Sequence, residues 1–115
     1  FSIVKQHGAL LAKSRIAGLQ FDTLFTNHLY EKGGETAILA ADRIRSALRE
    51  KDYPLAYDAP TNQIFLVLDE AQKTRLSKYV EMGFWENLAD GKTVMRIATS
   101  WATQDEDVDR LTALL

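Results

Sequence analysis

The sequence predicts an α/β fold, with an α+β-like small domain in which a small, mainly antiparallel sheet packs with helices and follows a long helix. Three observations predict it. Two stretches with helical apolar spacing come first, several short segments rich in β-forming residues follow, and an amphipathic stretch closes the chain. The chain has 115 residues, of which 46% are hydrophobic and 26% charged. This composition is enough for one globular domain and excludes a disordered tail.

Two helices are expected before any strand. Residues 2–26 are predicted to form one long helix, because apolar residues fall around one broad stripe: Leu10, Leu11, Ala17, Leu19, Phe21, Leu24 and Phe25. The breadth of the stripe indicates contacts on more than one side, with a missing part of the protein, a second subunit, or both. Thr26-Asn27 is expected to break or kink the helix. A second helix is predicted over 29–51, where apolar residues repeat at helical spacing: Ala37, Ala41, Ile44 and Leu48.

Short strands and turns are expected in the remaining part of the chain. Turn-forming residues separate four segments rich in β-formers, namely 53–57, 63–68, 84–85 and 93–101. The run 63–68 is apolar after its first residue, which predicts a strand buried on both faces. Asp69 is placed to cap a helix from Glu70 to about Tyr79. Thr103 and Glu106 have the spacing of a capping box and are expected to start a closing helix with an apolar face of Val108, Leu111 and Leu115.

Charge and residue types exclude several classes of function. The net charge of −2 offers no basic excess for a phosphate backbone, so we expect no nucleic-acid partner. No apolar run approaches the roughly 20 residues that a membrane span needs, so we expect no membrane partner. Without cysteine there is no disulfide framework, thiolate nucleophile or Cys-rich zinc site. The absence of cysteine fits a reducing compartment, and we expect a cytoplasmic protein.

Few residues offer a metal or phosphate site. His7 and His28 have no second ligand at metal spacing, so we expect no metal site. Gly33-Gly34 lacks the pattern of a phosphate-binding loop. The acidic run 105–109 lies at the start of a helix, where negative charge complements the helix dipole. Its spacing does not match that of an EF-hand calcium loop.

Arg96 and a small basic cluster are the remaining candidates. Arg96 lies inside the otherwise apolar segment 94–98, on the same predicted strand face as Val94 and Ala98. Its planar guanidinium suits bidentate binding of a carboxylate. The pattern alone favours a solvent-facing position, because burying an unpaired guanidinium is very costly. The first helix carries three cations that form either a solvated face or a phosphate contact: Lys5, Lys13 and Arg15.

Several segments resemble pyridoxal-phosphate-dependent threonine aldolases. Residues 5–15 (KQHGALLAKSR) and 18–25 (GLQFDTLF) are similar to the helix that follows the cofactor-lysine region, and 59–63 (APTNQ) to the start of a strand in that family. The strongest match covers 94–103 (VMRIATSWAT) and 106–109 (EDVD). It resembles the end of the group that contains low-specificity threonine aldolases and aromatic amino acid β-eliminating lyases. The likeness follows nearly the whole chain in order.

The resemblance implies that the chain is the C-terminal part of a fold-type I enzyme with pyridoxal 5′-phosphate as its cofactor. Residues 1–27 are then expected to be the long helix that ends the large cofactor domain, and 28–115 the small C-terminal domain. A start at Phe1 rather than Met fits a piece of a longer protein. The family's Schiff-base lysine lies upstream of Phe1. We therefore expect no catalytic residue in this chain, and no activity from the chain alone.

The resemblance also implies roles for individual residues. Arg96 matches the arginine that binds the substrate carboxylate, and the resemblance favours this role over a merely solvent-facing one. Arg15 falls near the position from which relatives reach the cofactor phosphate, and Lys13 competes equally for that role. A homodimer or homotetramer formed through the first helix is expected.

The activity implied by the resemblance is that of a carbon–carbon lyase. It is the aldol cleavage of L-threonine, or of a related β-hydroxy-α-amino acid, to glycine and an aldehyde. Two alternatives stay open: β-elimination of another amino acid by the same family, and a non-catalytic α/β interaction module.

Overall fold

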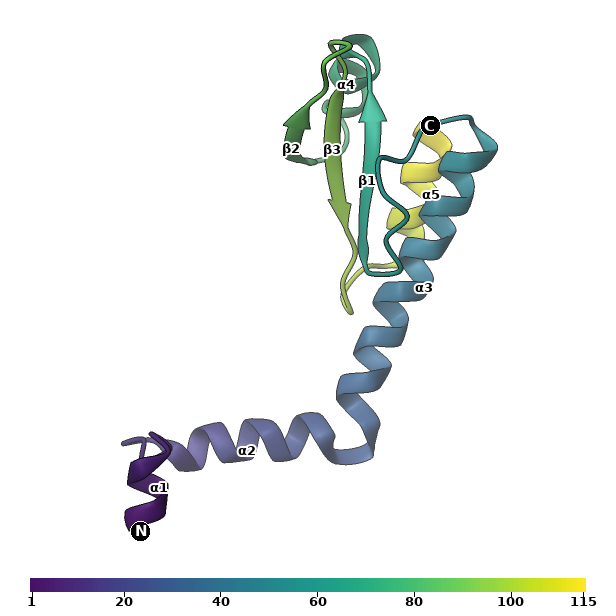
Figure 1. The fold of residues 1–115 in the computed structure, drawn as a ribbon. Coiled ribbons are helices and arrows are strands. Elements are labelled where there is room, and N and C mark those ends of the chain that lie inside the picture. Colours follow the sequence, from purple (N-terminus) through teal and green to yellow (C-terminus); the bar gives the residue numbers. More distant parts are fainter. The chain divides into compact units, whose positions relative to one another are not determined.

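The computed structural model describes residues 1–115, and the chain divides into two compact units, Phe1–Lys32 and Gly33–Leu115. The division falls inside the helix α3 (Leu29–Glu50), which is the second helix expected from the sequence (Figure 1). It lies five residues beyond the domain boundary expected after residue 27.

The first unit contains α1 (Ser2–Gln6), α2 (Ser14–Phe25) and the short 3-10 helix η1 (Thr26–His28). The prediction of one continuous helix over 2–26 is wrong. Gly8, two residues after the end of α1, adopts a left-handed conformation with φ +67°, and only glycine does so without strain. The predicted break at Thr26-Asn27 is confirmed, because Asn27 (φ 54°) and His28 (φ 58°) leave the helical region there.

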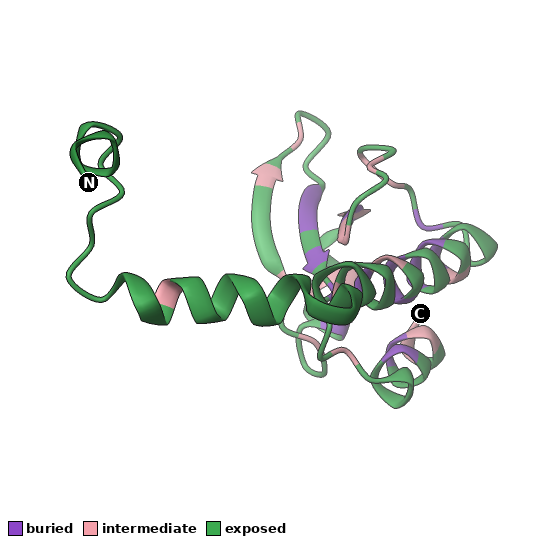
Figure 2. Cartoon of the chain, turned by 90° about the horizontal axis from the view of Figure 1, so that it is seen from below, coloured by how far each residue is buried: buried purple, intermediate pink, exposed green.

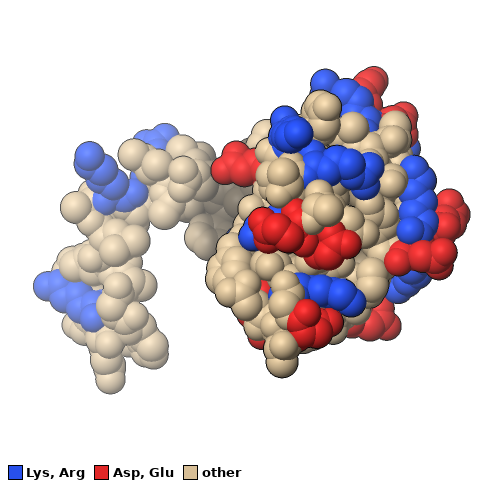
Figure 3. All heavy atoms as spheres, turned by 90° about the horizontal axis from the view of Figure 1, so that it is seen from above, with Lys and Arg blue, Asp and Glu red and all other residues tan.

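The first unit has no core of its own. Every residue of Phe1–Lys32 is exposed except Ala17, which is half-buried (Figure 2). The exposed residues include the large apolar side chains of the predicted stripe, such as Phe21 and Phe25, whose rings stack with centroids 6.3 Å apart. The face of this unit seen in Figure 3 shows basic side chains and broad uncharged areas. On the second unit, acidic and basic side chains are interspersed.

The second unit is a three-stranded antiparallel sheet covered by helices on one face. The strands are β1 (Gln63–Leu68), β2 (Gly83–Asn87) and β3 (Thr93–Ala98), in the spatial order β1-β3-β2. Helices α3 and α5 (Asp105–Leu114) lie side by side against the sheet, and α4 (Glu70–Leu76) follows β1 (Figure 1). This arrangement confirms the predicted class, a long helix and a small antiparallel sheet packed with helices.

The core lies between the sheet and these helices. The helical spacing predicted for α3 is confirmed, because all four of its apolar positions are buried: Ala37, Ala41, Ile44 and Leu48. The sheet contributes the residues of β1 and β3 that face the helices, namely Ile64, Leu66, Leu68, Met95 and Ile97, and α5 adds Val108 and Leu111. Burial of side chains of this size stabilises the fold by about 1.5–3 kcal/mol each.

The segment before β1 is not the strand that the sequence predicts over 53–57. Only Leu55 forms an isolated bridge, to Leu66. The amide of Val67 donates to the carbonyl of Pro54 at 2.9 Å, and that of Ala56 donates to the carbonyl of Phe65 at 2.8 Å. Pro54 has no amide to donate, so a regular ladder does not form. The segment nevertheless lies along β1 and covers what would otherwise be a free strand edge.

The predicted helix caps are correct for α4 and wrong for α5. Asp69 and Gln72 form a capping box at the start of α4. The N-cap of α5 is Gln104 rather than Thr103, and its side chain makes no capping bond. The hydroxyl of Thr103 accepts a hydrogen bond from the amide of Ser100 at 2.9 Å. It therefore closes the turn after β3 and is not available to cap the helix.

Opposite charges join the two helices behind the sheet. Arg43 on α3 forms ion pairs with Asp105 and with Asp109, the second at 2.6 Å. The acidic run of α5 therefore meets a cation of its neighbour as well as the positive end of its own dipole.

No helix of the structure is both long and apolar enough to span a membrane.

Candidate functional site

Arg96 lies on the face of the sheet that the helices leave open. On β3, Met95 and Ile97 point into the core, so Arg96 between them points to the opposite side. Arg96 is exposed, as is its predicted face-mate Ala98, whereas Val94, the other residue of that face, is buried. The guanidinium forms no ion pair and no hydrogen bond to another residue. It is therefore free to bind an anion from the open side.

The two neighbours of Arg96 across the sheet differ greatly in size. Arg96 pairs with Phe65 on β1 and with Gly83 on β2, and residues paired in this way share a sheet face. A Cβ atom placed on Gly83 would lie 3.5 Å from both Nε and Nη2 of Arg96. The guanidinium thus lies beside the glycine, and Phe65 occupies the other flank.

Aromatic side chains cover the rest of the open face. The ring of Phe65 meets that of Trp85 edge to face at 4.9 Å between centroids, and that of Tyr57 at 5.3 Å. A β-bulge between Phe84 and Glu86 interrupts the register of β2 with β3. At this bulge Trp85 reaches the aromatic cluster, and Glu86 accepts a hydrogen bond from the hydroxyl of Tyr57. The cluster Tyr57–Phe65–Trp85 forms a wall on one side of Arg96.

The hydrogen bond to the Glu86 carboxylate raises the pKa of Tyr57 above its ordinary value of 10.0, with a smaller contribution from desolvation. The carboxylate stabilises the protonated phenol because it accepts a hydrogen bond from the phenol hydroxyl, and it would repel a phenolate. The bond holds the loop before β1 against β2 across the open face.

A buried polar network fixes the end of β3 just beyond Arg96. The hydroxyl of Thr99 donates to the carbonyl of Ala37 on α3 at 2.6 Å, and the Asn62 side chain donates to the carbonyl of Thr99 at 2.6 Å. Arg45, only 5% exposed, donates to the carbonyl of Thr61 at 2.8 Å and to Asp42 at 2.7 Å. The loop before β1, the end of β3 and helix α3 are thereby joined.

Sequence reasoning missed Arg45, Asn62 and Thr99 as positioning residues. A signal existed for Arg45, which lies four residues after Ala41 and three before Leu48. A cation on an apolar helical stripe needs a buried partner. No comparable signal exists for Thr99, whose bond to Ala37 joins residues 62 positions apart.

The other candidate cations lie in the first unit. Lys13 is the N-cap residue of α2, and Arg15 lies in its first turn. Both are exposed and form no ion pair, and the first turn holds neither an acidic residue nor a side-chain cap. The positive end of the helix dipole adds to their charge, which suits an anion such as phosphate. His7 and His28 are exposed; His7 contacts the carbonyl of Ile3, and His28 lies 3.6 Å from Glu31.

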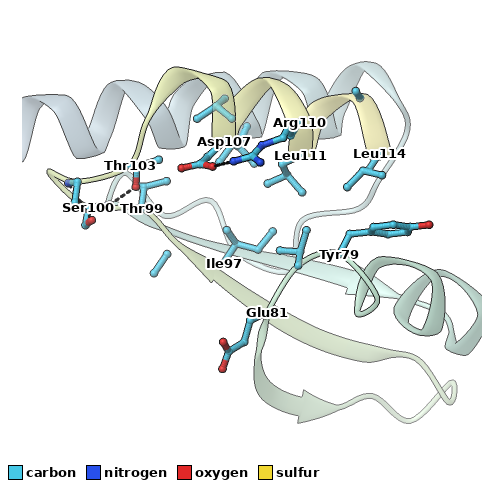
Figure 4. Close-up of a pocket in the computed structure, with 16 residues that line it drawn as sticks. Tyr79, Glu81, Ile97, Thr99, Ser100, Thr103, Asp107, Arg110, Leu111 and Leu114 are labelled. Carbon is cyan, nitrogen blue, oxygen red and sulfur yellow. Dashed lines mark hydrogen bonds and ion pairs between the residues drawn. The ribbon is translucent and has the colours of Figure 1, made fainter.

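A groove of about 830 Å³ lies on the helix side of the sheet, between α5, the end of β3 and the segment after α4 (Figure 4). Its walls are largely apolar, with Ile97 and Leu111 among them. Its charged residues include Arg110 and Asp107, which pair with each other, and its hydroxyls include Thr103, which is bonded to Ser100. These groups already have partners, which leaves Glu81 as the charged residue of the groove without an ion pair. Arg96 lies on the opposite face.

Comparison with solved structures relates this fold to known proteins. The chain superposes on Leishmania major threonine aldolase with a TM-score of 0.87 and 31% sequence identity, over 98% of this chain and 33% of that one. It also superposes on Sphingomonas wittichii serine palmitoyltransferase with a TM-score of 0.56 and 19% identity, over 69% of this chain and 22% of that one. The second likeness is one of fold alone.

The chain is threonine aldolase-like in fold and in sequence. This confirms the resemblance expected from its motifs. The threonine aldolase-like chain spans about a third of the length of the aldolase that it matches. No protein-family model and no curated protein matches the chain.

Replacing Thr99 by valine is expected to destabilise the protein by about 1–3 kcal/mol, because the buried bond to Ala37 is lost without a change of side-chain shape. Urea denaturation monitored by circular dichroism measures the change. Thr112→Val is the matched control, since the Thr112 hydroxyl bonds only within its own helix, to the carbonyl of Asp109. Equal stabilities of the two variants would show that the Thr99 bond contributes nothing.

Tyr57 is expected to titrate above pH 10.0, because its proton is held by Glu86. The stabilisation from this bond is fully present below the ordinary pKa and is lost as pH rises through the raised one. Ultraviolet difference titration of the protein against Tyr57→Phe isolates this phenol. Glu86→Ala should return its midpoint toward 10.0, whereas Glu81→Ala, which removes a carboxylate on the groove side, should not. A midpoint unaffected by Glu86→Ala would contradict the assigned cause.

Proposed function

We propose that the chain is the C-terminal part of a longer pyridoxal-phosphate-dependent lyase. This enzyme cleaves L-threonine or a related β-hydroxy-α-amino acid to glycine and an aldehyde. The observation that carries the proposal is the unpaired Arg96 on the open sheet face, in a chain that is 31% identical to a threonine aldolase over 98% of its length. The remaining two thirds of such an enzyme would supply the lysine that bonds to the cofactor.

The proposed role of Arg96 is to bind the α-carboxylate of the amino acid. The guanidinium offers two parallel N–H donors to the two carboxylate oxygens, which fixes the orientation of the substrate as well as its position. Fixing the carboxylate orients the bond from Cα to Cβ for cleavage. The aromatic wall beside Arg96 keeps water from one flank of the ion pair and strengthens it.

The proposed role of Lys13 and Arg15 is to bind the phosphate of the cofactor. Two unpaired cations at an uncapped helix N-terminus are a donor set that fits a phosphate dianion. The cofactor, when bound, serves as the electron sink for the cleavage of the Cα–Cβ bond. The chain's own contribution is binding and orientation, and we propose that it has no activity without the remainder of the enzyme.

β-Elimination from another amino acid is the second candidate activity. It is supported by the same arginine, because both reactions need a fixed α-carboxylate. In aldol cleavage the side chain leaves Cα, whereas in β-elimination a group leaves Cβ. The two activities therefore differ in the contacts that the enzyme makes to the departing group. An interaction module without catalysis is less well supported, because it gives no role to an unpaired arginine next to a glycine.

The activity of the full-length protein with threonine tests the proposal. Purified with pyridoxal phosphate, the protein is expected to show the visible absorption of the bound cofactor and to release glycine from L-threonine. Absorption without glycine would indicate the β-elimination candidate. No absorption after addition of the cofactor would contradict both activities.

Arg96→Ala is expected to raise KM for L-threonine about ten- to a hundredfold, because hydrogen bonds to a charged group contribute about 1.5–3 kcal/mol. Steady-state kinetics on the full-length variant measures the change, with circular dichroism as the test of folding. Arg49→Ala is the matched control, since Arg49 is an exposed arginine whose guanidinium pairs with Asp58, at 3.3 Å. An unchanged KM in Arg96→Ala would remove the carboxylate role.

We also propose that the full-length enzyme is a homodimer or homotetramer in which α2 packs against a second copy. The support is the exposure of its apolar side chains, with Phe21 64% and Phe25 57% exposed. An exposed apolar surface of this kind is typical of an interface. Water-exposed rings that become buried stabilise the assembly by about 1.5–3 kcal/mol each.

Phe21→Asp is therefore expected to shift the full-length protein toward monomer, because a charge would replace a ring that the proposed interface buries. Sedimentation velocity over a range of concentrations measures the shift. Gln20→Asp, the neighbouring substitution on a polar side chain of the same helix, is the control. A full-length protein that sediments as a monomer before any substitution would contradict the proposed assembly.

A further inference from the structure

Gly83 lies in a position where its missing side chain matters. It pairs with Arg96 from the edge strand β2, and a Cβ atom there would lie 3.5 Å from both Nε and Nη2 of the arginine. These two nitrogens are the donors of one edge of the guanidinium, the edge that can receive both oxygens of a carboxylate. Any side chain at position 83 would begin within contact distance of both donors and extend from there.

The other side of Arg96 leaves the guanidinium no equivalent space. Phe65, its pair on β1, is buried, with Tyr57 and Trp85 packed against its ring. The bulge after Phe84 keeps Trp85 in this cluster and Glu86 on the Tyr57 hydroxyl. The arginine turns toward the β2 edge, where the Nε–Nη2 edge of its guanidinium lies beside Gly83.

The backbone itself does not require a glycine at this position. Gly8 and Gly91 are the glycines with positive φ, and Gly83 is not among them. Glycine lacks a side chain to pack and therefore weakens a strand. β-Branched residues instead favour strand formation. A larger residue would thus be tolerated by the strand, and its side chain would contact the Nε–Nη2 edge of Arg96.

We propose that Gly83 is a positioning residue for Arg96 that keeps the Nε–Nη2 edge open for the substrate carboxylate. This inference rests on the proposed function of Arg96. A side chain at position 83 would take the space of the incoming oxygen or turn the guanidinium away from it. The amino acid would then bind less tightly, and its bond from Cα to Cβ would be less well oriented.

Gly83→Val in the full-length protein tests the inference. The variant is expected to raise KM for L-threonine about ten- to a hundredfold, the rise expected for Arg96→Ala, because both substitutions weaken the same contact. The dissociation constant for glycine, measured by isothermal titration calorimetry, should rise by a similar factor. Gly34→Val is the matched control, because an added Cβ at Gly34 meets nothing within 4 Å, and it should leave both constants unchanged.

A double-substitution cycle separates positioning from a general structural effect. In an Arg96→Ala background, Gly83→Val should raise KM no further, because the two substitutions act on one contact. An equal rise in both backgrounds would overturn the inference. If Arg96→Ala raises KM but Gly83→Val changes neither KM nor the affinity for glycine, the inference is also overturned. The proposed function would then stand. If Arg96→Ala itself had no effect, the carboxylate role and this inference would both fall.

Discussion

Coverage of only one face of the sheet is the constraint on which the second unit depends. Three strands with helices on one side send alternate residues of β3 into the core and to the open face. Met95 and Ile97 are held by packing against α3 and α5, and this fixes the register of the strand. Arg96 has no freedom to choose its side, because a shift by one residue would bury a guanidinium and expose two core side chains. The position of the arginine is thus a consequence of hydrophobic packing on the other face.

The open face is neither a second core nor an ordinary polar surface. The Tyr57–Phe65–Trp85 cluster buries Phe65 but leaves Trp85 47% and Tyr57 45% exposed. A guanidinium at the margin of such a cluster is less hydrated than one in open water, so its attraction to a carboxylate is stronger. The β-bulge contributes by turning Trp85 and Glu86 to the places where they meet β1 and the Tyr57 loop. Bulges often occur next to binding sites for this reason.

The sequence predicts those features that depend on local pattern. The apolar spacing of α3, the continuous apolar run of β1 and the capping box at Asp69 each determine their own element, and the structure has all three. The errors come from competition that a local pattern does not contain. Gly8 prefers a left-handed turn to a helix interior, and the Thr103 hydroxyl bonds to Ser100 rather than to its helix. The motif around Arg96 made the arginine a candidate for carboxylate binding, whereas its pairing with Gly83 depends on a strand register that no sequence pattern states.

The first unit differs from the second in the source of its stability. Helix α2 has 12 residues and buries none of them, and isolated helices of about 12–15 residues are marginal in water. The helix must then be stabilised by another surface that buries the apolar side chains around Phe21 and Phe25. Lys13 and Arg15 lie at the N-terminal end of the same helix, so the burial that stabilises α2 also fixes these two cations. Under the proposed function, the binding of phosphate and the packing of this helix are consequently coupled equilibria. A contact that orders α2 would strengthen the binding of an anion at its N-terminus, and the anion would strengthen that contact by the same factor.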